Sequence, residues 1–439
     1  NEHSYKPFER ASKTAHTSII NDEVVKDFIS NCHIPPFDDE FDPKDLIFAE
    51  IPNIENNPIK TIITIDGGYT DVVVKESYPS STFAFFQFGV LFFKFEDLNL
   101  IKTKPFIDPD DFSKLQRIQR FKLPLPTKGI TIKGEPDLVS SVRKSIYDFF
   151  MNNPEEESLI SALKWLIFEE FNNTKGSYWH LASCPHCGNG IDIRPASLKS
   201  DYTMDCPTCS KKVYLTDVFR LHEAIDNELG AGGILGYLST TIEQLLIVYL
   251  IKEILRTKPS ILKEVLIIKD GPLAYFGQTA NIHKPMRSLI NYLVKNHSIN
   301  LVGLEKSGSF VEHAVAIADK IERNKALLMS NKYIYKYIIP GQADESVPYG
   351  RTTYYSNKLI YKSEYDNIYV ATIPTSIPLL QPKREDFINL DVILSNVAAL
   401  KCDLYFNSLV PIVLANKLVS LADHPSSDLL KHFAQETLS

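Results

Sequence analysis

Two aspartates in this chain share one local design, an apolar β-rich run that leads into Asp-Gly. The first run ends at Asp66-Gly67 and the second at Asp270-Gly271. An aspartate at the end of a buried strand sits on a stiff element, and the following glycine lets a phosphate or metal approach the backbone. One such pair is usually a turn that ends a strand. Two of them suggest paired carboxylates that could share divalent metal ions, which prefer oxygen ligands.

Four of the six cysteines form a second chemical pattern. They stand in two Cys-x-x-Cys pairs separated by 18 residues, which is the spacing of a four-cysteine zinc site. Four thiolates close a tetrahedral coordination sphere, so we expect a structural Zn²⁺ with no catalytic water. The expected ligands are Cys184, Cys187, Cys206 and Cys209. His186 lies between two of these ligands and is interpreted as a bystander.

Composition bounds the class of protein. The chain has 439 residues, 44% of them apolar, and a formal net charge of −7. This balance argues against a generally basic DNA coat protein, although a local basic groove or a basic partner can supply phosphate contacts. The polar start and the lack of an apolar run of about 18 residues predict a soluble, cytoplasmic protein without a membrane segment.

The apolar pattern predicts a β-meander followed by alternating strands and helices, which is an α/β class with a mixed sheet. Strands are expected at 60–66, 70–78, 82–96, 264–270, 299–304, 333–339, 352–362 and 366–373, and little regular structure over 97–135. Helices are expected at 24–29, 137–151, 153–171, 216–227, 239–256, 284–296 and 309–322, and in the last part of the chain. The expected domains are an N-terminal extension (1–50), a nuclease-like domain (51–175 and 216–439) and an inserted zinc ribbon (176–215).

The order of these motifs resembles the NurA nucleases over about residues 60–420. The motifs are Asp66-Gly67-Gly68-Tyr69, a helical glutamate, Asp270-Gly271-Pro272-Leu273 and Gly303-Leu304-Glu305-Lys306-Ser307. The resemblance, to a bacterial-type member with an inserted ribbon, implies an RNase H-like, manganese-dependent DNA nuclease. It also implies a hexameric HerA-type ATPase as partner and a role in DNA end processing or anti-phage defence. By the same resemblance Asp66 and Asp270 bind metal, and Lys306 lies near the scissile phosphate.

The resemblance further implies a glutamate on the helix before the second Asp-Gly strand. Glu243 has the appropriate position, and we expect it to be a metal ligand. Thr240-x-x-Glu243 also fits a capping box, in which the glutamate bonds to its own helix N-terminus. Glu223 is the alternative site glutamate.

The C-terminal part departs from the family pattern. Ser408 and Asn416 stand where the family has tyrosine and histidine, and a shifted alignment would use Tyr405. The Asn416 amide could coordinate a metal or bond a phosphate, but it cannot titrate near neutral pH. We therefore include Asn416 among the site candidates.

These residue types suit phosphodiester hydrolysis with two Mn²⁺ or Mg²⁺ ions, and Lys306 would add positive charge beside the phosphate. Secondary ligand candidates are His222, His283 and His313. Residues 332–337 alternate as a strand does, and their tyrosines could stack single-stranded bases. We expect a homodimer docked on the HerA-type ATPase. The competing function is a catalytically weak or inactive adaptor subunit of a DNA-translocating complex.

Overall fold

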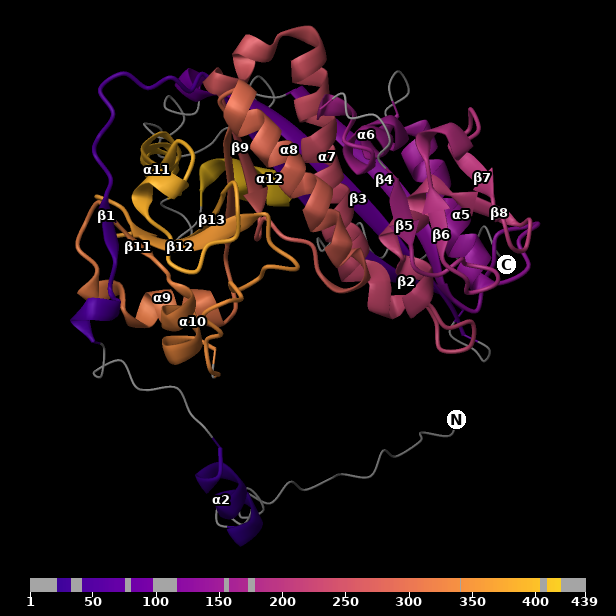
Figure 1. Cartoon of the computed structure of the whole chain (residues 1–439), viewed down its shortest axis with the longest axis horizontal. Helices are drawn as coiled ribbons and strands as arrows, with labels where there is room; N and C mark the ends of the chain where they lie inside the picture. Colours follow the sequence, from indigo (N-terminus) through magenta and orange to yellow (C-terminus); the bar gives the residue numbers. More distant parts are fainter. Residues whose placement is uncertain are drawn as a thin grey trace, which may run out of the picture.

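A computed structural model describes residues 22–32, 42–75, 80–97, 117–153, 158–172, 178–339, 341–402 and 409–419. A nine-stranded sheet runs through the body of the molecule, with helices on both of its faces (Figure 1). The strand order is β1-β11-β12-β13-β10-β9-β2-β3-β4. The strands are β1 (Phe48–Glu50), β2 (Thr61–Lys75), β3 (Ser81–Lys94), β4 (Arg117–Lys128), β9 (Val265–Asp270), β10 (Asn300–Glu305), β11 (Lys325–Leu328), β12 (Ser356–Lys362) and β13 (Ile368–Pro374).

The sheet is mixed, as expected for the α/β class. Strands β2, β3 and β4 form an antiparallel meander at one end. On the other side of β2, β9 is parallel to β2 and β10 is parallel to β9. An antiparallel meander followed by two parallel strands is the strand order of an RNase H-like core. The remaining four strands extend this core by antiparallel pairing.

Two main hydrophobic cores lie on the two faces of the sheet. Helices α5 to α8 pack on one face, and α11 and α12 pack on the other. A third, smaller core joins α9 and α10 to β11–β13. The helices are α2 (Glu23–Ser30), α5 (Leu138–Asn152), α6 (Leu159–Ile167), α7 (Leu235–Thr257), α8 (His283–Asn296), α9 (Ser309–Ala316), α10 (Asn331–Tyr337), α11 (Leu390–Ala399) and α12 (Val410–Val419).

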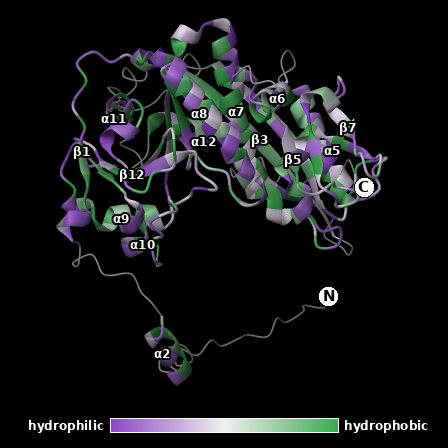
Figure 2. Ribbon diagram, viewed as in Figure 1, coloured by the Kyte–Doolittle hydropathy of each residue, from purple (hydrophilic) through white to green (hydrophobic). Residues whose placement is uncertain are grey.

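Helix α7 is apolar around most of its circumference, which is typical of a helix buried on all sides. Within the described residues, the stretch Gly232–Thr257 is long and apolar enough to cross a membrane, but 78% of its apolar window is buried inside the protein. It is the central helix of the core on its face of the sheet. Figure 2 shows the contrast with α2, which stands apart from the body and buries none of its residues.

The sheet differs from expectation at the first Asp-Gly. The expected strands 60–66 and 70–78 are one strand, β2, which continues through Asp66 and Gly67 to Lys75. Pairing with β9 ends at Ile65, but pairing with β3 goes on, so the chain does not turn. Asp66 therefore lies in the middle of a strand, at the point where one of its two neighbouring strands stops.

Residues 332–337 were expected as a strand and are helix α10. Ser330 caps this helix by accepting a hydrogen bond from the Tyr333 N–H (3.1 Å). Tyr333 and Tyr337, four residues apart, both face the small core and contact each other, with ring centroids 4.9 Å apart. Over so short a stretch the apolar residues fit both the two-residue period of a strand and the 3.6-residue period of a helix. Packing of Tyr333 and Tyr337 on one face favours the helix. The idea of a base-stacking strand at these residues is wrong.

Three other expectations were wrong in detail. Strand β4 was missed because Pro124 and Pro126 interrupt its pattern, but an edge strand tolerates proline. The expected helix at 216–227 is two short 3-10 segments, because Arg220 between them has a left-handed backbone (φ 59°). Asn153 ends α5 rather than starting the next helix, which begins after Ser158.

Candidate functional site

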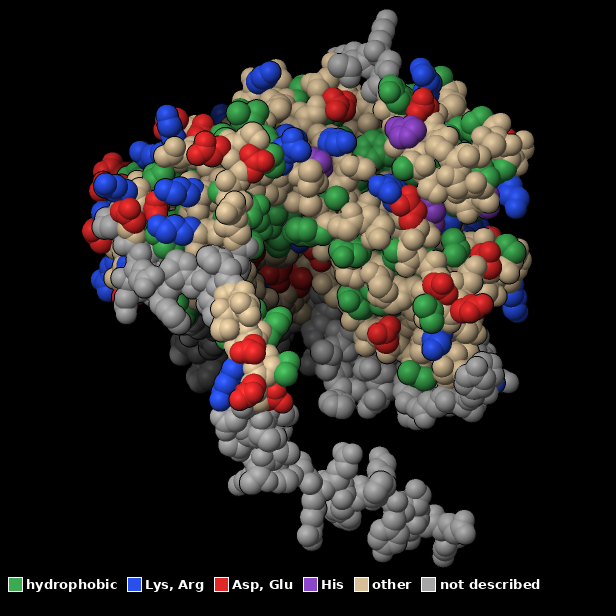
Figure 3. Space-filling model, turned by 60° about the horizontal axis from the view of Figure 1, so that its bottom comes forward, with side chains coloured by type: hydrophobic (Ala, Val, Ile, Leu, Met, Phe, Trp, Pro, Cys, Tyr) green, Lys and Arg blue, Asp and Glu red, His purple; other side chains and the backbone are tan. Residues whose placement is uncertain are grey.

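The two Asp-Gly aspartates are carried by neighbouring parallel strands. Asp270 is the last residue of β9, and Gly271 after it has φ 94°, a conformation that favours glycine. Asp66 lies on β2 one residue beyond the last pair with β9, Ile65 with Lys269. The sheet topology thus brings together two residues that are about 200 positions apart in sequence. Figure 3 shows a hollow between the two halves of the molecule with acidic side chains on its floor.

A chain of polar contacts connects the two aspartates. Lys306, which follows β10, forms an ion pair with Asp270 Oδ2 (Nζ–Oδ2 2.6 Å). With its amide oriented to satisfy both neighbours, Asn416 of α12 accepts a hydrogen bond from Lys306 Nζ (2.7 Å) and donates to Asp66 Oδ2. Helix α12 therefore contributes a residue to the same site as β2, β9 and β10. The structure brings together four of the five residues expected in the catalytic set by direct contact.

Asp66 is the buried carboxylate of this group. It is 7% exposed, and its Oδ1 accepts a hydrogen bond from the Gly67 N–H (2.9 Å). Burial raises the pKa of Asp66 to about 7, and the negative charges of Asp270 and Glu243 add to this, while Lys306 opposes it. A buried carboxylate with like charges around it favours a cation as neighbour.

Glu243 reaches the site from α7, on the opposite face of the sheet. Its Oε2 forms an ion pair with Lys269 Nζ (2.7 Å), and both side chains are buried. Burial raises the pKa of Glu243, although the positive charge of Lys269 acts against it. A Cβ on Gly67 would lie 2.9 Å from Glu243 Oε1 and 2.5 Å from the Phe88 ring, so the glycine leaves the room that this carboxylate occupies.

Lys269 is a site residue that the sequence reasoning missed. Besides holding Glu243, its ammonium donates to the backbone carbonyl of Asp270 (2.6 Å). The signal in the sequence was a lysine that stands between the apolar run Val265–Ile268 and the aspartate. A lysine in a strand that is buried on both faces needs a partner charge.

The donor set suits a hard divalent cation such as Mg²⁺ or Mn²⁺, whose ligands are carboxylate and amide oxygens. Asp66, Asp270 and Asn416 offer such oxygens at one place, and burial together with the nearby carboxylates raises the pKa of Asp66. In the described part of the chain, no three acidic residues bring carboxylate oxygens within 4.8 Å of one another. The lysines keep the carboxylates apart, so a cation would have to compete with Lys306 for Asp270.

The other candidates lie elsewhere. Glu223 pairs with Arg220 of its own segment (2.6 Å), which leaves Glu243 as the glutamate beside the aspartates. The three histidines bond to neighbouring groups: His222 to the Ser183 carbonyl, His283 to the Ala280 carbonyl and His313 to the Tyr333 hydroxyl. Tyr405 and Ser408 lie outside the described residues.

The four cysteines form a separate cluster. All four sulfur atoms lie within 4.8 Å of one another, with Cys184–Cys209 and Cys187–Cys206 separations of 3.9 Å. The cluster lies between two small hairpins, β5 (Trp179–Leu181) with β6 (Ile191–Ile193) and β7 (Thr203–Asp205) with β8 (Lys212–Tyr214). This arrangement is compatible with a zinc ribbon.

A buried ion pair joins α5 to Asp217, which lies just after the ribbon, and the same arginine also contacts the ribbon itself. The Arg143 guanidinium donates to both carboxylate oxygens of Asp217 (2.8 Å each), and both side chains are buried. The same guanidinium lies 3.2 Å from the His186 ring and 5.1 Å from the centre of the Tyr214 ring. His186 is thus a docking residue between the ribbon and the body.

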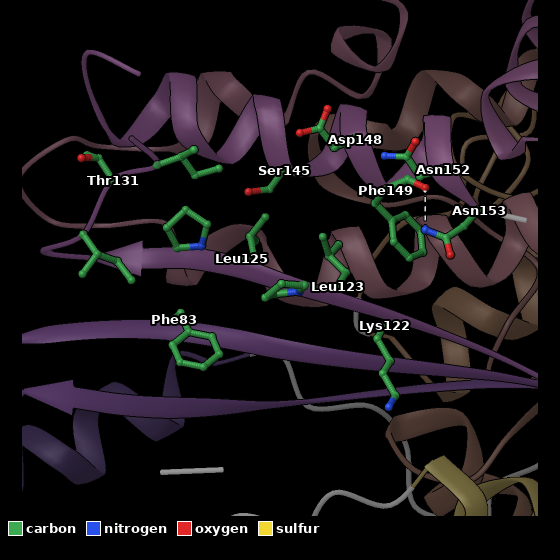
Figure 4. A pocket seen from close by; sticks show the side chains of 14 residues that line it. Phe83, Lys122, Leu123, Leu125, Thr131, Ser145, Asp148, Phe149, Asn152 and Asn153 are labelled. Atoms are coloured by element: carbon green, nitrogen blue, oxygen red, sulfur yellow. Dashed lines mark hydrogen bonds between the residues drawn. The ribbon is translucent and has the colours of Figure 1, made fainter. Parts of the chain in front are cut away.

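A pocket of about 510 Å³ lies between β4 and α5 (Figure 4). Its walls are mainly apolar and include Phe83, Leu123, Leu125 and Phe149, with Lys122 at its border. We call the group formed by Asp66, Glu243, Lys269, Asp270, Lys306 and Asn416 the acidic site. None of these residues lines the pocket, so the pocket has no part in the chemistry of the acidic site.

Comparisons with known proteins add little to this description. The chain matches no protein-family model and no curated protein. Among solved structures it is similar to the NurA nuclease from Sulfolobus solfataricus, with 8% identity, 97% of each chain covered and a TM-score of 0.34. A TM-score this low carries no argument about fold or function. The fold assignment therefore rests on the strand order of the sheet. Any assignment of function rests on the residues gathered around Asp66 and Asp270.

Proposed function

We propose that this chain is a divalent-metal-dependent nuclease that hydrolyses phosphodiester bonds of DNA. The observation that carries the proposal is the contact chain from Asp66 through Asn416 and Lys306 to Asp270. It places the buried carboxylate of Asp66, the partly exposed carboxylate of Asp270, an amide and an ammonium group together at the end of the parallel strands. In open α/β sheets this is where ligands bind.

Each residue has a role that follows from its chemistry. Asp66 and Asp270 would hold a Mn²⁺ or Mg²⁺ ion, with the Asn416 amide oxygen as a further ligand. Such an ion, when bound, polarises the phosphate and activates a water. If Asp270 held the cation, the ammonium group of Lys306 would be released from its ion pair and could face the phosphate. Its side chain is 33% exposed, so it has the freedom to do so.

The proposal includes the partners expected from the sequence. With a net charge of −7, unaided capture of DNA would be weak, because non-specific affinity comes mainly from Lys and Arg contacts to phosphate. A HerA-type hexameric translocase that feeds DNA into a homodimer of this chain would supply a high local concentration. Helix α2 is a candidate docking element, since Val24 is 77% and Phe28 70% exposed. End processing and anti-phage defence are both compatible with such a complex.

The test is hydrolysis of labelled linear DNA by purified protein with Mn²⁺, with and without the ATPase. Asp270→Asn should lower the rate by about 10²–10³-fold or more, because it removes an anionic ligand while keeping the shape of the side chain. Glu223→Gln is the matched control, since it changes an acidic residue outside the site and should leave the rate unchanged. Full activity in a folded Asp270→Asn protein would refute the proposal. No activity in the wild-type protein, even with the ATPase, would favour the adaptor alternative.

A further inference from the structure

The acidic site contains two lysine–carboxylate pairs that differ in how accessible they are. The side chains of Lys306 and Asp270 are 33% and 22% exposed. Those of Lys269 and Glu243 are only 3% and 9% exposed. An accessible ion pair is weak and exchanges partners readily, whereas separating a buried pair leaves an uncompensated charge away from water. Asp270 is therefore free to accept a cation, and Glu243 is not.

The surroundings of Lys269 keep its ammonium group in place. It donates to Glu243 Oε2 and to the Asp270 carbonyl, which are 2.7 and 2.6 Å away. Gly67 and Gly271 leave space around this arrangement, since a Cβ on Gly67 would approach Glu243 and one on Gly271 would lie 3.4 Å from Lys269 Nζ. The ammonium group is thus fixed by a carboxylate, a carbonyl and the packing of two strands.

The formal charge of the acidic site also favours a single divalent cation. Three carboxylates and two ammonium groups leave the site with one formal negative charge. One divalent cation would make the site modestly positive, which suits a phosphate. A second cation would have to enter beside Lys269, where a positive charge is already buried.

We infer that Lys269 takes the place of a second metal ion, so that the site binds one divalent cation per chain, on the side of Asp66 and Asp270. Glu243 then serves as the counter-ion of Lys269 and is not a metal ligand. This inference rests on the proposed function and replaces the two ions and the metal-binding Glu243 expected from the sequence. Lys269 is a positioning residue: it holds Glu243 and the end of β9 and does not touch the substrate.

The test counts Mn²⁺ ions by electron paramagnetic resonance of free Mn²⁺ during titration of zinc-loaded protein. A nuclease-resistant phosphorothioate oligonucleotide is present to supply phosphate oxygens. The wild-type protein should bind one Mn²⁺ per chain. Lys269→Met should bind two, because Glu243 is released. Glu243→Gln should still bind one, with less than about a threefold change in affinity, since the amide oxygen can keep the hydrogen bond from Lys269.

Lys358→Met is the matched control for loss of a buried lysine. Lys358 is 4% exposed and forms an equally short pair with Glu305 (2.6 Å). Its removal should leave the count at one. Two ions in the wild-type protein, one ion in folded Lys269→Met, or loss of the ion in Glu243→Gln would each overturn the inference. If the wild-type protein bound two ions and hydrolysed DNA with Mn²⁺, the inference would be wrong but the nuclease proposal would stand. If it neither bound Mn²⁺ nor hydrolysed DNA, both the inference and the nuclease proposal would be wrong.

Discussion

The ribbon and the acidic site are both suited to metal ions, but they are built in opposite ways. The ribbon takes four thiols from two turns that lie close in sequence, Cys184–Cys187 and Cys206–Cys209. The acidic site takes its groups from β2, α7, β9, the end of β10 and α12. The first site depends on local spacing, and the second depends on the topology of the whole sheet.

The two sites also differ in the groups that surround the position of a metal ion. The four sulfur atoms of the ribbon lie within 4.8 Å of one another, so four thiolates can close around one soft ion. The carboxylates of the acidic site are separated by lysines, and the site stays open to exchange on the side of Lys306. We therefore expect the ribbon metal to be permanent and structural and the acidic-site metal to be exchangeable and catalytic.

The largest effect is expected in the ribbon. Cys206→Ser should abolish zinc binding and unfold residues 178–215, because the metal supplies about 10–16 kcal/mol of binding free energy in zinc-finger peptides. Elemental analysis measures the zinc, and hydrogen exchange measures the unfolding. Cys402→Ser, a buried cysteine outside the cluster, is the control and should keep its zinc. Zinc retained at one ion per chain in Cys206→Ser would contradict the four-cysteine assignment.

The attachment of the ribbon to the body gives the next prediction. Arg143→Met should reduce the free energy of unfolding by about 3–5 kcal/mol, because it leaves the buried Asp217 carboxylate without its partner. The neighbouring Lys144 is a matched control, since its pair with Asp148 is partly exposed and Lys144→Met should change stability by less than about 1 kcal/mol. Urea unfolding measures both. Equal effects of the two substitutions would show that the buried Arg143–Asp217 pair adds no more stability than the Lys144–Asp148 pair.

The smallest effect concerns the backbone beside the acidic site. Gly67→Ala should destabilise the protein by about 1–3 kcal/mol and slow hydrolysis, because the added Cβ meets Phe88 and Glu243. Gly236→Ala on α7 is the control: nothing lies within 4 Å of its Cβ position, and alanine should stabilise the helix by about 0.4–1 kcal/mol. Thermal unfolding and the hydrolysis rate are the measurements. A neutral Gly67→Ala would mean that Glu243 can move away without consequence.

The contrast between the two sites explains which features could be predicted from the sequence. The cysteine cluster follows from spacing alone, and the α/β class follows from the order of strand and helix patterns. A common site for Asp66 and Asp270 was suggested by their shared motif, but their proximity depends on β9 pairing beside β2, which no local pattern specifies. The continuation of β2 beyond Asp66 was missed for the same reason, since pairing with β3 decides it.

Lys269 shows a different limit of sequence reasoning. A lysine beside an aspartate normally indicates a polar strand end, and only its burial and its distance to Glu243 of α7 give it a role. Asn416 was included through the family resemblance, and its contacts with Asp66 and Lys306 depend on how α12 packs against the sheet. Ion pairs and hydrogen bonds between different helices and strands cannot be predicted until the packing of those elements is known.

The central claim is that hydrolysis depends on an exchangeable hard cation at the acidic site and not on the ribbon metal. The most direct test treats purified protein with a weak chelator that removes Mg²⁺ and Mn²⁺ but leaves the thiolate-bound zinc, confirmed by elemental analysis. This protein should not cleave labelled DNA, and adding Mn²⁺ should restore cleavage in the wild-type protein but not in Asp66→Asn. Cleavage by the zinc-containing, Mn²⁺-free protein, or Mn²⁺-restored cleavage in Asp66→Asn, would contradict the account.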